Sequence, residues 1–325
     1  MRLPKFSYFE PVSLEEAVSL LSQGGSAKIL AGGTDLLVNM KHKIEVPSAL
    51  VNIKKIEGLD YIRTHQGAVH IGVLTTLKKI SQDPFLQEKI PALTQAAASV
   101  GSYHHQCMGT LGGNICQQNR CKFYNQSEWW RSTNGPCLKV GGKVCHVVAK
   151  QENCFSSYCG DVAPALLALE SRVVVQTKNG TKDMALENLF SGKGLAPLAL
   201  QSGDLLKEIV IPEEALTGNS RYAKFANRES IDFPIVGMAL WLSPEKKEYR
   251  AAFTAVDRRP LRATSVENLL NQKDLTEDLI EEAGSLAAKE AQPVKTSLYS
   301  SAFKKKMMGI LLRRALKETE RGTQS

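Results

Sequence analysis

Short apolar runs and helically spaced apolar positions alternate along the first two thirds of the chain. Ser13 and Glu16 form a capping box, and the apolar residues behind them recur at helical spacing, so we expect a helix there. Short apolar or β-branched runs predict strands, and wider helically spaced patterns predict further helices. The predicted strands are 28–31, 50–53, 69–73, 172–176 and 205–211, and the other predicted helices are 36–40, 91–100 and 162–169.

A change of composition at residues 213–220 predicts a linker between two lobes. Beyond it, apolar runs predict strands at 222–225, 237–242 and 249–256, and helical patterns follow to the end. The sequence contains no internal repeat. We therefore predict an α+β fold with a first domain over residues 1–216 and a second domain over residues 217–325.

The composition is that of an ordinary globular protein, so it excludes few classes of protein. The chain has 325 residues, of which 43% are hydrophobic and 23% are charged, and this length suits two domains. The longest apolar runs, such as 236–242, are far shorter than the roughly 20 residues of a membrane span. The first residues lack the apolar segment of a secretory signal. We expect a cytoplasmic protein that does not enter a membrane.

The net charge of +8 raises nucleic acid as the first alternative ligand. The basic residues are scattered, however, and the densest cluster is Lys304, Lys305 and Lys306. This cluster lies in a helical pattern beside apolar residues, so it is either a solvated helix face or a basic patch for an acidic partner. We favour the solvated face and expect no nucleic-acid ligand.

The cysteines carry the strongest chemical signal. All seven lie between Cys107 and Cys159. Disulfides would require an oxidising compartment and an export signal, and zinc sites usually contain a Cys-x-x-Cys hairpin, which this sequence lacks. The wide spacing suits a loop folded around a larger object, and an iron–sulfur cluster takes four thiolates from separate positions. An iron–sulfur cluster, a zinc site and buried free thiols remain open from the spacing alone.

Two glycine pairs follow apolar segments and precede polar residues. Gly32-Gly33 is followed by Thr34 and Asp35, and Gly112-Gly113 lies between Thr110 and Asn114. Neither pair is part of the Gly-x-Gly-x-x-Gly fingerprint of dinucleotide-binding strands and helices. We interpret each as a strand followed by a Gly-Gly turn, which lets backbone N–H groups point toward an anion. A tight turn explains either pair alone, whereas the two together favour a diphosphate held between them.

Several segments resemble the FAD-binding subunits of molybdenum hydroxylases, a family that includes xanthine and carbon monoxide dehydrogenases. The resemblance covers nearly the whole chain and is carried by residues 29–36, 72–77, 110–114, 160–166 and 228–234. It implies an FAD-binding domain of the vanillyl-alcohol-oxidase (PCMH) type. The second lobe is then an α+β domain of the CO dehydrogenase flavoprotein type.

The resemblance also implies which residues contact FAD. The two Gly-Gly segments would embrace the pyrophosphate, the aspartate of an Asp-x-x-Pro element would bind the flavin side, and a lysine of the second lobe would lie near the ring. These residues are Ile29, Leu30, Ala31, Gly32, Gly33, Thr34, Asp35, Leu36, Thr110, Gly112, Gly113, Asn114, Asp161 and Lys224.

The cysteine-rich insert over residues 115–160 resembles the β subunits of 4-hydroxybenzoyl-CoA reductases. Those subunits carry an additional 4Fe-4S cluster in this loop. The resemblance places the cluster ligands at Cys121, Cys137, Cys145 and Cys154. It makes Cys116 a buried neighbour and leaves Cys107 and Cys159 outside the pattern, with Cys159 the competitor of Cys154 for the fourth position.

The sequence offers no catalytic triad, no acid–base pair and no metal-binding spacing of its six histidines. We take His104-His105 as a polar pair at a helix end. What remains is electron transfer, for which FAD exchanges one or two electrons. The resemblance implies a molybdenum-cofactor large subunit and a small subunit with two 2Fe-2S clusters, in a dimer of heterotrimers.

If the resemblance to 4-hydroxybenzoyl-CoA reductases holds, ferredoxin supplies electrons for the reductive dehydroxylation of 4-hydroxybenzoyl-CoA to benzoyl-CoA. The near alternative is a related molybdenum hydroxylase that oxidises another aromatic or heterocyclic substrate. The alternative from another class is a zinc-stabilised binding module without flavin.

Overall fold

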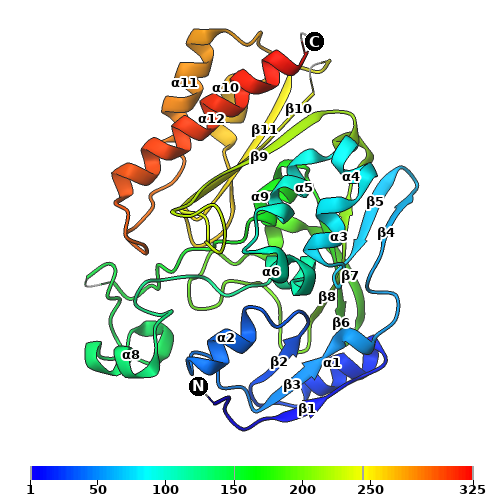
Figure 1. The fold of residues 1–325 in the computed structure, drawn as a ribbon, viewed down its shortest axis with the longest axis vertical. Helices are drawn as coiled ribbons and strands as arrows, with labels where there is room; N and C mark the ends of the chain where they lie inside the picture. The colour runs from blue at the N-terminus through cyan, green and yellow to red at the C-terminus, as the bar shows by residue number, and fades with distance from the viewer. Residues whose placement is uncertain (1, 150, 244, 324–325) are drawn as a thin grey trace.

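The computed structural model describes residues 2–149, 151–243 and 245–323, with side chains up to residue 318. Its N-terminal end is a three-stranded parallel sheet in the order β1-β3-β2, at the bottom of Figure 1. Ser13 caps the first helix by accepting a hydrogen bond from the amide of Glu16, as the capping box predicts. The elements are β1 Ser7–Phe9, α1 Leu14–Ser22, β2 Ala27–Leu30, α2 Leu36–Lys41, β3 Ala49–Asn52 and the 3-10 turn η1 Ile53–Lys55.

A five-stranded antiparallel sheet follows, in the order β4-β5-β8-β6-β7. Short helices pack against it, and α5 and α9 contact each other over its apolar face. The strands are β4 Ile62–His65, β5 Ala68–Gly72, β6 Arg172–Thr177, β7 Gly180–Ala185 and β8 Leu205–Ile211. The helices are α3 Leu77–Gln82, α4 Pro84–Lys89, α5 Pro91–Ala98, α6 Tyr103–Met108, α7 Leu111–Ile115, α9 Val162–Ala168 and the 3-10 turns η3 Leu186–Leu189 and η4 Glu213–Leu216.

The cysteine-rich insert projects from the body between α7 and α9. Figure 1 shows its helix α8 at the lower left, separated from the sheets. Its elements are α8 Glu128–Asn134 and the 3-10 turn η2 Leu138–Val140. Arg131 donates hydrogen bonds to the carbonyl oxygens of His42 and Lys43, so the insert is tied to the end of α2.

The C-terminal lobe, at the top of Figure 1, is a four-stranded antiparallel sheet in the order β12-β11-β10-β9, covered on one face by helices. Its elements are β9 Asn219–Phe225, β10 Val236–Ser243, β11 Glu248–Thr254, β12 Leu261–Arg262, α10 Thr264–Leu270, α11 Glu277–Ala287 and α12 Ser301–Thr323. Every residue of β10 is buried, which is why this strand reads as a continuous apolar run.

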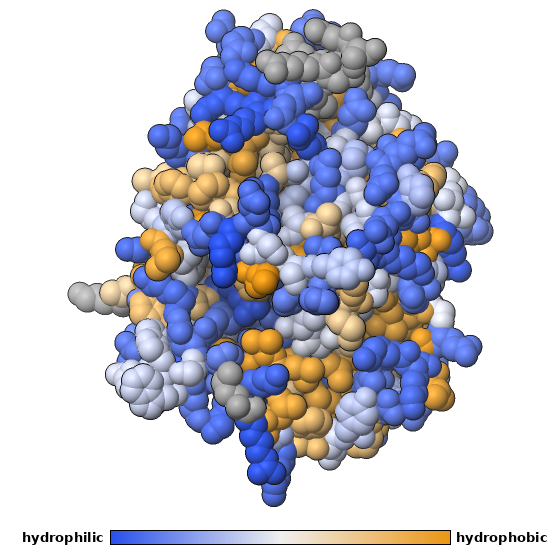
Figure 2. Space-filling model, in the orientation of Figure 1, coloured by the Kyte–Doolittle hydropathy of each residue, from blue (hydrophilic) through white to orange (hydrophobic). Residues whose placement is uncertain are grey.

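Alternating residues of β10 join the two lobes. Ala239 and Trp241 pack into the core of the first lobe, while Met238 and Leu240 pack into the core beneath α10, α11 and α12. The side chains of a strand point alternately to the two faces of its sheet, so one strand can serve both cores. Figure 2 shows that polar side chains dominate the surface of the C-terminal lobe, while apolar ones gather at the bottom of the view.

The strands and helices named from the sequence are present, with ends shifted by a few residues. Two interpretations were wrong. Gly112-Gly113 lies inside the short helix α7 and not in a turn after a strand. Lys304 is 2% exposed and donates to the carbonyl oxygen of Ala255, so this lysine is not part of a solvated face, whereas Lys306 is exposed as expected. No helix among the described residues is long and apolar enough to cross a membrane.

Candidate functional site

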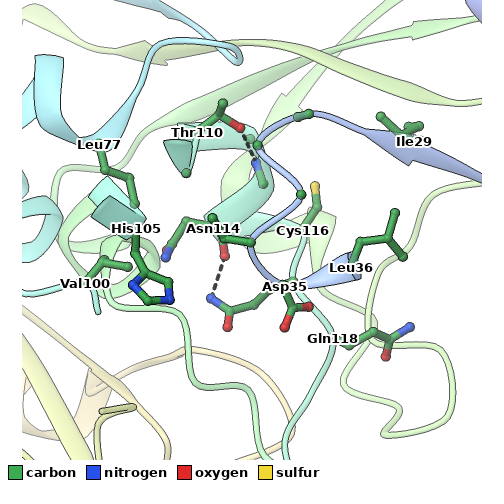
Figure 3. A pocket seen from close by; sticks show the side chains of 18 of the residues that line it. Ile29, Asp35, Leu36, Leu77, Val100, His105, Thr110, Asn114, Cys116 and Gln118 are labelled. Atoms are coloured by element: carbon green, nitrogen blue, oxygen red, sulfur yellow. Dashed lines mark hydrogen bonds between the residues drawn. The ribbon is translucent and has the colours of Figure 1, made fainter. Parts of the chain in front are cut away.

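A cavity of about 540 Å³ lies between the N-terminal sheet, α6, α7 and the C-terminal lobe. We call it the flavin cavity. This volume is within the range of pockets that hold cofactors and drug-sized ligands. Figure 3 shows Ile29 and Leu36 on one side of it and Leu77 and Val100 on the other. All but two of the residues that the resemblance assigned to FAD line this cavity; the exceptions are Leu30 and Lys224.

The first glycine turn supplies unused backbone donors. Within the described ranges, the amides of Gly32, Gly33 and Thr34 donate to no protein acceptor. Gly33 has φ +74°, and a Cβ on Gly32 would lie 2.1 Å from the carbonyl oxygen of Met108. Only glycine therefore allows both the left-handed backbone and the close approach of this turn to α6. Free amides at a glycine turn form a ready site for phosphate oxygens.

The second glycine pair acts differently from the first. The amide of Gly112 donates to the carbonyl oxygen of Val73 (3.0 Å), and that of Gly113 donates to Thr110 Oγ1 (3.2 Å). Both N–H groups are therefore satisfied by the protein, which corrects the expectation of two similar anion nests. Because glycine has no side chain, this pair leaves space in the cavity wall. A Cβ on Gly113 would have Thr110 Oγ1 as its only neighbour within 4 Å.

Asp161, in the wall of the cavity, forms an ion pair with Lys224. Lys224 Nζ lies 3.0 Å from Asp161 Oδ1 and also donates to the carbonyl oxygens of Ser99 and Asp232. Tyr222 donates its hydroxyl to the same carboxylate at 2.8 Å. Burial raises the pKa of Asp161, and the charge of Lys224 together with the Tyr222 hydrogen bond opposes that rise. Lys224 therefore does not line the cavity itself and is connected to it through its ion pair with Asp161.

Several polar residues of the cavity wall were missed by the sequence reasoning. His105 points into the cavity in Figure 3, where the helix-end interpretation had given the pair no site role, and its Nδ1 lies 2.8 Å from Ser102 Oγ. Gln118 and Arg120 also line it, as does Phe233 of the C-terminal lobe. No spacing marks these residues, because α6 and loops distant in sequence bring them together.

The residues of this cavity fit FAD. Free amides and a close glycine wall suit the pyrophosphate, and the apolar side chains Ile29, Leu36, Leu77 and Val100 suit flat rings. The fit rests on the donors and the space that the chain itself provides.

A second, smaller cavity lies inside the insert, and all four cysteines assigned by the resemblance line it. We call it the cysteine cavity. Its wall also holds aromatic and apolar side chains, among them Phe123, Tyr124 and Phe155. Gly142 and Gly194 permit the close packing: a Cβ there would lie 1.8 Å from Pro136 O and 2.3 Å from Cys154 O, respectively. The cysteines are Cys121, Cys137, Cys145 and Cys154.

The other three cysteines lie elsewhere. Cys116 lines the flavin cavity, and burial raises the pKa of its thiol to about 12. Cys159 is buried near Lys304, and burial raises the pKa of its thiol to about 11. Cys107 belongs to α6, and all seven thiols are free in the described structure. Among the described residues, no three or more His, Cys, Asp or Glu side chains are arranged to hold a single metal ion.

A glycine-walled cavity with free amides, enclosed by two lobes, defines a protein that binds an extended phosphate-containing cofactor. The model "FAD binding domain in molybdopterin dehydrogenase" matches residues 4–214, and "CO dehydrogenase flavoprotein C-terminal domain" matches residues 186–319. The chain therefore belongs to the FAD-binding subunits of molybdopterin dehydrogenases of the xanthine and CO dehydrogenase type. It is an oxidoreductase subunit, and the predicted α+β fold class is confirmed.

Individual relatives agree with this family. The chain is 31% identical to the nicotinate dehydrogenase FAD-subunit of Eubacterium barkeri over 71% of this chain and 67% of the relative. It is 27% identical to the carbon monoxide dehydrogenase medium chain of Hydrogenophaga pseudoflava over 96% of both chains. A solved structure of carbon monoxide dehydrogenase from that organism superposes with a TM-score of 0.81 at 26% identity, covering 99% of each chain.

Proposed function

We propose that this chain is the flavin and iron–sulfur subunit of a molybdenum enzyme that reduces 4-hydroxybenzoyl-CoA to benzoyl-CoA. The reaction consumes two electrons and two protons per substrate and releases the phenolic hydroxyl as water. The chain's own task is to accept electrons and to pass them to partner subunits, and FAD supplies the exchange between one- and two-electron steps. The substrate would bind on the molybdenum subunit.

One observation carries the proposal: Cys121, Cys137, Cys145 and Cys154 line the same cavity although they are spread over the insert. Four cysteine thiolates are the donor set of a 4Fe-4S cluster, and the aromatic and apolar side chains of this wall are joined by Lys139, His146 and Ser156. Cys159 lies outside this cavity, which favours Cys154 as the fourth ligand.

The same proposal assigns the flavin site and the partners. The FAD pyrophosphate would lie against Gly32, Gly33 and Thr34, with Asp161 toward the flavin ring and Lys224 acting through Asp161. The partners would be a molybdenum-cofactor large subunit and a small subunit with two 2Fe-2S clusters, in a dimer of heterotrimers. We keep the domain division at 216/217 and a cytoplasmic location as predictions.

Metal and flavin analysis of the anaerobically purified full chain tests the cluster. We expect about four irons with matching acid-labile sulfide, and one FAD per chain. Serine in place of Cys121, Cys137, Cys145 or Cys154 should remove most of the iron. The matched variants Cys107→Ser and Cys159→Ser should retain it. Zinc in the wild-type chain, or iron that survives all four substitutions, would contradict the cluster.

We propose ferredoxin as the electron donor, since the net charge of +8 suits an acidic carrier. Complementary charge speeds encounter and is screened by salt, so the rate of reduction by ferredoxin should fall steeply as salt is added. The rate of reduction by dithionite, measured in the same solutions, is the control. A donor rate that is independent of salt would rule out this electrostatic role.

A second candidate is a molybdenum hydroxylase that oxidises another aromatic or heterocyclic substrate. It is favoured by the 31% identity to a nicotinate dehydrogenase FAD-subunit. Under this candidate the electrons leave the molybdenum subunit and reach an external acceptor through FAD. The assembled enzyme distinguishes the two: benzoyl-CoA formation with reduced ferredoxin supports the first, and substrate-dependent dye reduction by a heterocycle supports the second.

A further inference from the structure

The flavin cavity and the cysteine cavity meet at one short segment of the insert. Gln117, Gln118 and Arg120 line the flavin cavity, and the next residue, Cys121, lines the cysteine cavity. The walls of the two cavities are therefore joined by consecutive residues of one chain segment.

Arg120 fixes this segment on both sides. Its backbone pairs with Ser157 through two hydrogen bonds, of 2.7 Å from Arg120 N and 2.9 Å from Ser157 N. Its guanidinium forms an ion pair with Asp35, beside the first glycine turn, and lies 4.2 Å from the centroid of the Phe233 ring. One residue thus connects the base of the insert, through its backbone, with the turn with free amides and the C-terminal lobe, through its side chain.

The neighbouring polar groups support the same connection. Asn119 donates to the carbonyl oxygens of Ser156 (2.9 Å) and Arg258 (2.8 Å), so both chain segments at the base of the insert are tied together. Ser156 also lines the cysteine cavity. Within the described ranges, Arg120 Nε and Gln118 Oε1 are buried and have no hydrogen-bond partner, although both residues line the flavin cavity. Buried polar atoms normally have partners, and both of these unpaired atoms belong to residues of the flavin-cavity wall.

We propose that Arg120 is a positioning residue that couples the two cavities: an ordered, filled cysteine loop holds Arg120 against Asp35 and so strengthens FAD binding. This inference rests on the proposed function for the identity of the two occupants. Coupling between two sites is reciprocal, so FAD must strengthen retention of the cluster by the same factor. An ion pair with a merely local role would produce neither effect.

The first test measures FAD affinity of the full deflavinated chain, by quenching of flavin fluorescence, with the cluster loaded and after removal of iron. We expect the wild-type Kd for FAD to be about fivefold higher, or more, without the cluster than with it, which is a typical size for allosteric coupling. In Arg120→Gln the two values should become equal. Lys122→Gln removes the same charge on the other side of Cys121, and Lys122 lines neither cavity, so this variant should keep the wild-type ratio.

Arg120→Lys keeps the charge and tests the planar contacts. We expect an intermediate ratio, because an ammonium can pair with Asp35 but cannot stack on Phe233 as a guanidinium does. Equal Kd values for the two wild-type states, or a wild-type ratio in Arg120→Gln, would overturn the coupling.

A second measurement does not require iron and separates this inference from the proposed function. FAD should slow backbone hydrogen exchange across residues 119–125 in the wild type and in Lys122→Gln, but not in Arg120→Gln. Unchanged exchange at 119–125 in the wild type, with FAD bound, would overturn the coupling even if the cluster is present. Absence of iron would instead overturn the proposed cluster and leave the exchange result to decide the role of Arg120.

Discussion

At the scale of single residues, Glu208 shows how the fold accommodates a buried charge by surrounding it with partners. Glu208 of β8 is 7% exposed, and it accepts a hydrogen bond from the hydroxyl of Tyr61. His70 Nδ1 lies 3.2 Å from it, and Arg63 lies 3.4 Å away. Burial acts to raise the pKa of Glu208, but these hydrogen bonds and charges outweigh it and lower the pKa below the ordinary value of 4.5. The carboxylate is therefore more stable in the folded than in the unfolded chain.

Glu208→Gln tests this balance through pH. Because the folded pKa is lowered, Glu208 stabilises the fold above pH 4.5, and this contribution disappears as the pH falls through the folded value. We expect the variant to lose about 1–3 kcal/mol of unfolding free energy near neutral pH, and the difference from wild type to shrink below pH 4.5. Urea unfolding of the full chain from pH 3.5 to pH 7 measures it, with the exposed Glu57→Gln as control. A difference that stays constant over this range would refute the assignment.

At the scale of elements, the two glycine segments have similar sequences but different structures and different roles in the cavity wall. The first is a turn that presses against α6 and leaves its amides free, whereas the second begins α7 and has its amides bonded. Gly32 is therefore required by the packing of the protein itself. Gly113 is exposed to the cavity and is required only by what binds there.

Alanine at each glycine separates these two requirements. In Gly32→Ala the Cβ would overlap the backbone of Met108, so we expect a loss of about 1–3 kcal/mol in stability together with weaker FAD binding. In Gly113→Ala the Cβ would lie 3.1 Å from Thr110 Oγ1, a contact that a small shift of this side chain relieves, and alanine favours a helix, so stability should stay within about 1 kcal/mol while FAD binding weakens. Denaturant unfolding of the deflavinated chain and FAD titration measure the two effects. Unchanged FAD affinity in Gly113→Ala would place the cofactor away from α7.

At the scale of the whole molecule, the lobes are joined by a shared core. Trp241 of β10 is 1% exposed, packs into the core of the first lobe and donates from Nε1 to the carbonyl oxygen of Ala215 at 2.9 Å. The guanidinium of Arg250 lies 4.2 Å from its ring centroid. Because one sheet closes both cores, neither lobe can lose its structure without exposing apolar surface of the other.

We therefore expect the deflavinated chain to unfold in one transition. Circular dichroism and tryptophan fluorescence should give the same denaturant midpoint, and Trp241→Ala should lower the unfolding free energy by about 3–5 kcal/mol without splitting the transition. Trp129→Ala is the matched control, because that side chain is 74% exposed on α8, and its effect should be small. Two separated transitions in the wild type would show that the lobes fold independently.

The sequence predicted the elements well where periodicity was strong, and it predicted the first glycine turn correctly but took the start of α7 for a second one. It found Ile29, Asp35 and Asn114, which line the flavin cavity near the glycine segments. It missed the place of His105 and Arg120 in the cavity wall, since neither the His104-His105 pair of α6 nor a single arginine in a loop carries a spacing signal. It also assigned Lys304 to the surface, because a lysine that reaches a buried carbonyl oxygen has the same place in a helical pattern as a solvated one.

The sequence by itself determined the α+β pattern, the two glycine segments and the clustering of cysteines, because each depends on neighbours within a few residues. Only the tertiary structure decided which amides are free, which cysteines share a cavity and how Arg120 connects the two cavities. These features depend on contacts between segments that lie far apart in the sequence. Arg120, for example, contacts both Asp35 and Phe233, and Phe233 is more than a hundred residues away from it. Local periodicity holds no information about such contacts, whereas packing of the sheets and the insert fixes them.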